Sequence, residues 1–164
     1  MFYGYVEAER KTQSKEHRKM TPLNEIQKMS IAKRIDFIEL ELKDLEEYGG
    51  LDFDTYSQNR KTRRDVERIS ENIANASIDI GKVVLAGEDI ELPETYKDIF
   101  KKLVQIKIVS EDLGESLSNL ARLRNILAHQ YLDIKWAMIR DFIIRGKNDV
   151  QVFLTIVREQ IIKT

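Results

Sequence analysis

The stretch VERISENIANASIDIGKV, residues 66–83, indicates the fold class because its apolar residues recur every three or four positions. This spacing places them on one face of an α-helix, which repeats about every 3.6 residues. The face consists of Val66, Ile69, Ile73, Ala76, Ile80 and Val83. We therefore predict a long amphipathic helix from about Tyr56 to Ala86, ended by Gly87.

The segments on either side of this helix also read as helices. Residues that could begin one are Asn24, Pro93, Ser110, Asp133 and Asn148. We expect the first of these helices to reach Tyr48 and the one that starts at Ser110 to reach Tyr131. No segment alternates like a strand, so we predict an all-α fold, an antiparallel helical bundle of about five helices. Residues 1–22 are interpreted as a polar N-terminal extension and 23–164 as the helical-bundle domain.

Composition narrows the class of protein. A chain of 164 residues suggests one domain. Cysteine is absent, which excludes disulfides and thiolate metal sites. No apolar run approaches the roughly 20 residues that span a bilayer, and the N-terminus does not resemble a signal peptide, so we expect a cytoplasmic protein without membrane association. The net charge of −1 gives no overall positive field for nucleic acid, so any RNA contact needs a local patch.

The stretch LARLRNILAHQYLD, residues 120–133, holds the candidate chemistry. On a regular helix Arg124 falls at the centre of an apolar stripe, whose residues all point within about 60° of its direction around the helix axis. The stripe contains Leu113, Leu117, Leu120, Ala121, Leu127, Ala128 and Tyr131. A guanidinium there must find a partner, because burying it unpaired costs several kcal/mol. An ion pair with a carboxylate and a side chain that reaches out to solvent are both compatible with the pattern.

His129 lies on the neighbouring polar face of this segment. That face comprises Ser118, Arg122, Asn125, His129 and Asp133. The only other histidine, His17, falls in the predicted extension. In a regular helix His129 would point about 140° away from Arg124. The two converge only if the helix bends or a second subunit completes the site.

A second polar stripe borders the apolar face of residues 66–83. It consists of Arg68, Asn72, Asn75 and Asp79. A solvated helix face with ion pairs four residues apart would also explain the charges near Arg68. Asparagine and aspartate are poor helix formers, however, which favours a specific role for the rest of the stripe.

The string from Arg124 to Tyr131 resembles the HEPN motif: arginine, a polar residue, a short spacer and histidine. The tyrosine two positions after His129 is characteristic of the HepT branch of that family. Residues 73–86, 92–96 and 108–113 are similar to the same branch, so the resemblance spans about 24–145. Two features depart from the family: Lys135 stands where it often has aspartate, and the first twenty residues have no counterpart.

This resemblance implies a HEPN-like four-helix core with a C-terminal helix, and a metal-independent RNA endonuclease that needs no cofactor. It also implies a homodimer whose two motifs face each other across a cleft. HepT proteins are similar in being toxins paired with a small MntA-like nucleotidyltransferase antitoxin. That antitoxin silences the toxin by transferring AMP to the motif tyrosine, here Tyr131. From its place on the stripe alone, Tyr131 would be a core aromatic residue.

RNA cleavage without a metal needs proton transfer and charge stabilisation. Histidine titrates near neutral pH, and a guanidinium can bind two phosphate oxygens at once. We therefore predict His129 as general acid or base, Arg124 as the phosphate clamp and Asn125 as the group that orients the histidine or the scissile phosphate. The expected substrate-binding residues are Arg68, Asn72, Asp79 and Arg122.

Two alternatives stay open from the sequence. A non-catalytic HEPN subunit would bind a nucleotide or a nucleotidyltransferase through the same cleft. A plain helical scaffold would leave Arg124 without a role.

Overall fold

The computed structural model describes residues 22–129 and 132–162, and within these ranges it contains helices and no β-strand. The all-α prediction is confirmed. The predicted extension lies outside the described residues except for Pro22, and so does Tyr131. None of the helices in the described part combines the length and the apolar character that crossing a bilayer requires.

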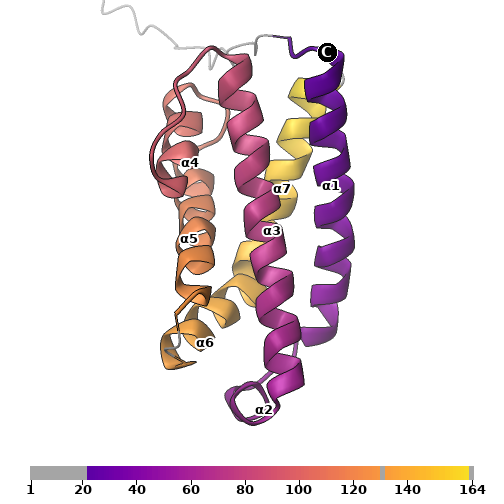
Figure 1. Ribbon diagram of the computed structural model, residues 1–164, viewed down its shortest axis with the longest axis vertical. Coiled ribbons are helices and arrows are strands. Elements are labelled where there is room, and N and C mark those ends of the chain that lie inside the picture. The colour runs from indigo at the N-terminus through magenta and orange to yellow at the C-terminus, as the bar shows by residue number, and fades with distance from the viewer. Residues whose placement is uncertain (1–21, 130–131, 163–164) are drawn as a thin grey trace, which may run out of the picture.

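The elements form a helical bundle (Figure 1). They are α1 (Glu25–Leu45, then a 3₁₀ turn Glu46–Tyr48), α2 (Phe53–Gln58), α3 (Arg60–Gly87), α4 (Tyr96–Gln105), α5 (Glu111–Leu127), α6 (Leu132–Asp141), a π-helical turn (Phe142–Gly146), α7 (Lys147–Val157) and a π-helical turn (Arg158–Ile162). In Figure 1, α3 runs along the long axis between α1 and α5 and in front of α7, while α2 and α6 lie at one end.

Two predicted helix starts are confirmed by their capping hydrogen bonds. The Asn24 side chain accepts from the backbone N–H of Gln27, whose own side chain accepts from the Asn24 N–H. This reciprocal pair satisfies two donors that a helix start leaves unpaired. Ser110 caps α5 in the simpler way, by accepting from the N–H of Leu113.

The prediction of one helix from Tyr56 to Ala86 is wrong at its beginning. The chain leaves the helical conformation at Asn59, with φ −94° and ψ 97°. The Asn59 side chain then accepts from the N–H of Thr62 and begins α3 anew. A short side-chain amide makes this cap as well as serine or aspartate does, which stabilises the break.

Three other predicted starts are also wrong. Pro93 lies in the segment before α4, which begins at Tyr96 after an extended Thr95. Asp133 falls inside the first turn of α6 instead of preceding it. Asn148 lies inside α7, because the helical conformation continues from α6 through the π-helical turn and leaves no free helix start to cap.

The core confirms the apolar face predicted for residues 66–83. Within it, Val66, Ile73, Ala76 and Ile80 are buried, while Ile69 and Val83 are partly buried. Gly81 lets α4 approach α3 closely, because a Cβ at that position would lie 2.7 Å from Cγ2 of Ile99. This close approach fixes where the first turn of α4, and with it Tyr96, lies relative to α3.

A polar network supports the end of the bundle where α2 and α6 meet. The Tyr56 hydroxyl donates to Oε1 of Glu67 at 2.6 Å, and Nζ of Lys135 lies 3.8 Å from the same oxygen. Burial and the hydrogen bond to Glu67 raise the pKa of Tyr56 well above its ordinary value, so it stays a neutral donor. Trp136 covers Tyr56, with ring centroids 5.2 Å apart. The charge of Lys135, which departs from the family pattern, is therefore paired within the fold.

Candidate catalytic site

Arg124 lies on α5, and its half-buried side chain contacts both α3 and α4. Its Nε donates a hydrogen bond of 3.1 Å to Oδ1 of Asn75 on α3. The ring of Tyr96, at the start of α4, lies against the guanidinium, with 5.1 Å between its centroid and Cζ. That distance is typical of a cation–π contact. Residues from two other helices therefore orient this one side chain.

The partners of Arg124 are neutral. Its remaining hydrogen bond within the described residues is a longer one, from Nη1 to Oδ1 of Asn125 at 3.5 Å, and it forms no ion pair with a described carboxylate. Neither an ion pair nor a side chain held only in solvent, the two arrangements left open by the sequence, is found. An amide oxygen and an aromatic face orient the guanidinium without cancelling its charge, so that charge is available to an anion.

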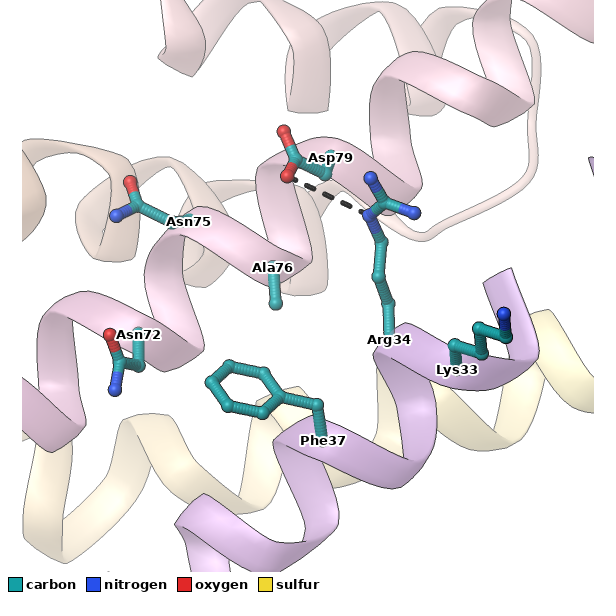
Figure 2. Close-up of a pocket in the computed structure, with 7 residues that line it drawn as sticks. All are labelled: Lys33, Arg34, Phe37, Asn72, Asn75, Ala76 and Asp79. Carbon is teal, nitrogen blue, oxygen red and sulfur yellow. Dashed lines mark ion pairs between the residues drawn. The ribbon is translucent and has the colours of Figure 1, made fainter. Parts of the chain in front are cut away.

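Three residues of the polar stripe of α3 bind two neighbouring helices, α1 and α5. Asn72 donates from Nδ2 to Oε2 of Glu41 on α1 at 3.2 Å. Asp79 pairs with Arg34 of α1, with 3.6 Å between Oδ2 and Nε, as the dashed line in Figure 2 marks. Asn75 lies between them in sequence and binds α5 through the arginine described above. The stripe thus serves the packing of α1 and α5 on α3.

A groove of about 300 Å³ runs along this stripe between α1 and α3 (Figure 2). Phe37 projects into it from α1 and is 41% exposed. The lining residues are Lys33, Arg34, Phe37, Asn72, Asn75, Ala76 and Asp79. Because Asn75 lines the groove and also binds Arg124, the groove and the arginine are neighbours in space.

His129 lies in the connection between α5 and α6, and its side chain is exposed. Helix α5 ends at Leu127, and the N–H of His129 bonds to the carbonyl of Ile126 at 2.9 Å to form a turn. The prediction that this helix reaches Tyr131 is therefore wrong. The angle of about 140° between Arg124 and His129 assumed a regular helix and does not apply beyond its end.

Asn125 and Arg122 are both exposed on α5. Asn125 lies next to Arg124 in sequence and is its weakest partner, at 3.5 Å. Arg122 lines a different pocket, between α4 and α5, together with Lys97 and Lys101. That pocket is basic but shares no lining residue with the α1–α3 groove.

Arg68 lies on the solvent side of α3, where its Nη1 is 3.1 Å from Oε2 of Glu71. It lines a third pocket that also includes Leu127, near the end of α5. The four predicted substrate-binding residues are therefore spread over three places. Asn72 and Asp79 share one groove, while Arg68 and Arg122 each line another pocket.

Two residues at the arginine site were not among the candidates from the sequence. Tyr96 appeared only within the segment 92–96 that resembles the HepT branch, and Lys82 was not singled out. Nζ of Lys82 lies 5.1 Å from the centroid of the Tyr96 ring. Periodicity assigns a residue to a face of its own helix, whereas these contacts depend on how α3, α4 and α5 meet.

The motif thus offers an oriented guanidinium at Arg124 and, five residues later, an exposed imidazole at His129. A guanidinium can bind two phosphate oxygens at once, and an imidazole can gain or lose a proton near neutral pH. Among residues 22–129 and 132–162, no cluster of three or more histidine, aspartate or glutamate side chains is arranged to hold a metal ion. Acid–base chemistry on a phosphodiester needs groups of these two kinds.

Comparison with known proteins gives consistent matches. A family model described as Ribonuclease HepT-like matches residues 38–157. The chain is 22% identical to the mRNA nuclease HepT of Shewanella oneidensis over 85 residues, 52% of this chain and 64% of that protein. It is 26% identical to the tRNA nuclease HepT of Aphanizomenon flos-aquae over 112 residues, 68% of this chain and 76% of that protein.

Solved structures show the same fold. The chain superposes on the tri-AMPylated HEPN toxin of Shewanella oneidensis, solved in complex with its MNT antitoxin, with a TM-score of 0.72 and 20% identity. That match covers 84% of this chain and 99% of the toxin. The alignment to the curated Shewanella nuclease spans less than two thirds of that protein. The family model, in contrast, extends from α1 to the end of α7 and includes the whole motif. The chain therefore belongs to the ribonuclease HepT-like family.

Proposed function

We propose that this protein is a metal-independent RNA endonuclease that acts in the cytoplasm as the toxin of a toxin–antitoxin pair. The observation that carries the proposal is the guanidinium of Arg124, which neutral partners orient and leave uncompensated. The exposed His129 follows five residues later. Family membership and the two nucleases named HepT support the activity. The likeness to a toxin bound to its antitoxin supports the biological role.

In the proposed reaction the 2′-OH of the RNA attacks the adjacent phosphorus and the bond to the 5′ oxygen breaks. The products are a 2′,3′-cyclic phosphate and a free 5′-OH. His129 takes the proton from the 2′-OH or gives one to the leaving 5′ oxygen. Arg124 binds the non-bridging oxygens, where negative charge gathers in the transition state. Asn125, exposed beside Arg124, orients the histidine or the phosphate.

The RNA strand extends from this point along the surface grooves. Asn72 and Asp79 line the α1–α3 groove, which meets the arginine at Asn75. Arg122 and Arg68 line the two other pockets and bind phosphates farther from the cleaved bond. Contacts of this kind add affinity without sequence selectivity.

We propose a homodimer with the two motifs face to face. The side chain of Arg124 is turned inward toward α3 and α4, whereas that of His129 is exposed. A second subunit would bring an exposed imidazole to the arginine of the first. Sedimentation or light scattering of the purified protein tests the dimer, and a monomer that cleaves RNA would contradict it.

The proposed control of the toxin is adenylylation of Tyr131 by an MntA-like nucleotidyltransferase antitoxin. The tyrosine oxygen attacks the α-phosphorus of ATP, AMP is transferred and pyrophosphate leaves. The added bulk and negative charge next to His129 would repel RNA phosphate. Intact mass spectrometry after incubation with the antitoxin and ATP tests this. No added AMP mass on the Tyr131 peptide would refute it.

The activity is tested on total RNA in the presence of EDTA. The wild type is expected to cleave, and Arg124→Ala and His129→Ala are expected to lose cleavage while remaining folded. Arg60→Ala, which changes an exposed arginine at the start of α3, is the matched control and should cleave normally. Cleavage that survives in both site variants would overturn the mechanism. Growth arrest on expression, relieved by His129→Ala, would separate the enzyme from a non-catalytic subunit.

A further inference from the structure

The aromatic ring of Tyr96 is shared by two cations from different helices. Nζ of Lys82 on α3 and Cζ of Arg124 on α5 each lie 5.1 Å from the ring centroid. The two positive centres therefore cannot be farther apart than twice that distance. We refer to Lys82, Tyr96 and Arg124 as the Tyr96 clamp.

The close approach of α3 and α4 builds this clamp. Gly81 precedes Lys82, and any Cβ at Gly81 would overlap Ile99 of α4, with 2.7 Å to Cγ2. Ile99 is one helical turn after Tyr96, so the contact that needs glycine also sets the position of the ring. Lys82 and Tyr96 are both half-buried, which limits the directions in which the lysine can extend.

Neither cation of the clamp is neutralised within the described part of the chain. Arg124 bonds to amide oxygens, and Lys82 forms no ion pair with a described carboxylate. Some of the cations on the same helices and on the helices beside them do form ion pairs with carboxylates: Arg34 with Asp79, Arg68 with Glu71, Lys101 with Asp98 and Lys135 with Glu67. On α4 itself, Asp98 is engaged by Thr95 and Lys101. The described part of the fold thus holds two positive charges against one aromatic ring without a counter-ion for either.

Electrostatics favours an anion at this place. The upper limit on their separation, twice 5.1 Å, is comparable with the screening length of about 8 Å at physiological salt, so the two charges repel each other and their fields add. The face of one aromatic ring offsets only part of that repulsion, roughly 0.5–1 kcal/mol for each cation at exposed sites. An anion that touches both cations would relieve the rest, and a polyanion could place one phosphate at each.

We propose that Lys82 is a substrate-binding residue that holds the RNA phosphate next to the one bound by Arg124. This inference rests on the proposed ribonuclease function and deepens it. The two cations suit different tasks, because the planar guanidinium forms paired hydrogen bonds to one phosphate and the ammonium acts as a point charge. Lys82 therefore contacts a phosphate whose charge does not change during the reaction. Such a contact binds the substrate and the transition state equally well.

Binding is measured in a His129→Ala background, in which RNA stays intact, with a fluorescent single-stranded RNA oligonucleotide and increasing salt. Lys82→Gln is expected to weaken binding roughly tenfold, which is the loss of one charge-assisted contact. It should also lower the slope of log affinity against log salt by about 0.7, the value for one phosphate on a single strand. Lys82→Arg should keep the slope. Lys43→Gln, on the exposed side of α1, is the matched control and should change neither quantity.

Cleavage by the protein with His129 intact gives the second readout. Lys82→Gln should raise KM roughly tenfold and leave kcat within about a factor of two, since the contact is equal in both states. Wild-type affinity and salt slope in Lys82→Gln would overturn the inference. An equal loss of binding in Lys82→Arg and Lys82→Gln would also overturn it, because it would show a structural role. A wild type that binds RNA without cutting it would defeat the proposed function and leave the binding comparison intact.

Discussion

The two halves of the motif differ in how firmly the fold holds them. Arg124 is half-buried and contacts Asn75 of α3 and Tyr96 of α4. His129, five residues later, lies in an exposed turn, and within the described residues its side chain has no hydrogen-bond partner. The proposed phosphate-binding group, Arg124, is therefore preorganised within one chain. The proposed proton-transfer group, His129, is left to be positioned by the substrate or by a second subunit.

The largest expected effect comes from changing the preorganised half while keeping its charge. Arg124→Lys should lower kcat by roughly 10²–10³-fold, because an ammonium cannot replace the paired hydrogen bonds at the transition state. The thermal midpoint should change little. Single-turnover cleavage of an RNA oligonucleotide measures the effect. If Arg124→Lys cleaves as fast as the wild type, a positive charge alone suffices. The geometry that Asn75 and Tyr96 impose would then be irrelevant to the reaction.

The next effect tests the packing that places the Tyr96 ring. Gly81→Ala puts a methyl group 2.7 Å from Cγ2 of Ile99 and should destabilise the fold by about 1–3 kcal/mol, a usual cost of overpacking. Gly50→Ala, where nothing lies within 4 Å of the new Cβ, is the matched control. Urea denaturation compares the two variants. Equal midpoints would mean that α3 and α4 adjust without strain.

A smaller effect distinguishes orientation from charge at the same arginine. Asn75→Asp keeps an acceptor for Nε of Arg124, but the new acceptor is a negatively charged carboxylate. The guanidinium should therefore be held more tightly, and its positive charge should be compensated. We expect stability to be unchanged or higher and cleavage to fall about tenfold, through weaker attraction of phosphate. Parallel melting and cleavage assays measure both. A rise in RNA cleavage by Asn75→Asp would show that the reaction does not require a neutral partner for Arg124.

The smallest effect concerns the exposed half. His129→Ala should change the free energy of unfolding by less than about 0.5 kcal/mol, because surface side chains without partners contribute little. Arg124→Ala should cost more, since it removes a hydrogen bond and a cation–π contact, each worth about 1 kcal/mol. Chemical denaturation of both variants gives the comparison. A larger loss for His129→Ala would show that the histidine is held inside the fold.

The errors made from the sequence lie at the ends of helices. The caps at Asn24, Ser110 and Asn59 all involve residues three apart in the chain, and the first two, which follow non-helical segments, were predicted. At Asn59 the chain forms two helices instead of the single one that was predicted. An asparagine within a helical pattern does not show whether the helix continues or breaks there. The end of α5 at Leu127 is likewise invisible, because Ala128 fits a helix as well as a turn.

The sequence by itself determined that the fold is helical, which residues form the core face of α3, and that an arginine interrupts the apolar face of α5. These follow from periodicity, which is a property of each helix alone. Only the tertiary structure decided the partners of that arginine. Whether a guanidinium meets a carboxylate, an amide or an aromatic ring depends on which helices come into contact and at what distance. Here the close approach at Gly81 brings Tyr96 and Lys82 together beside Arg124.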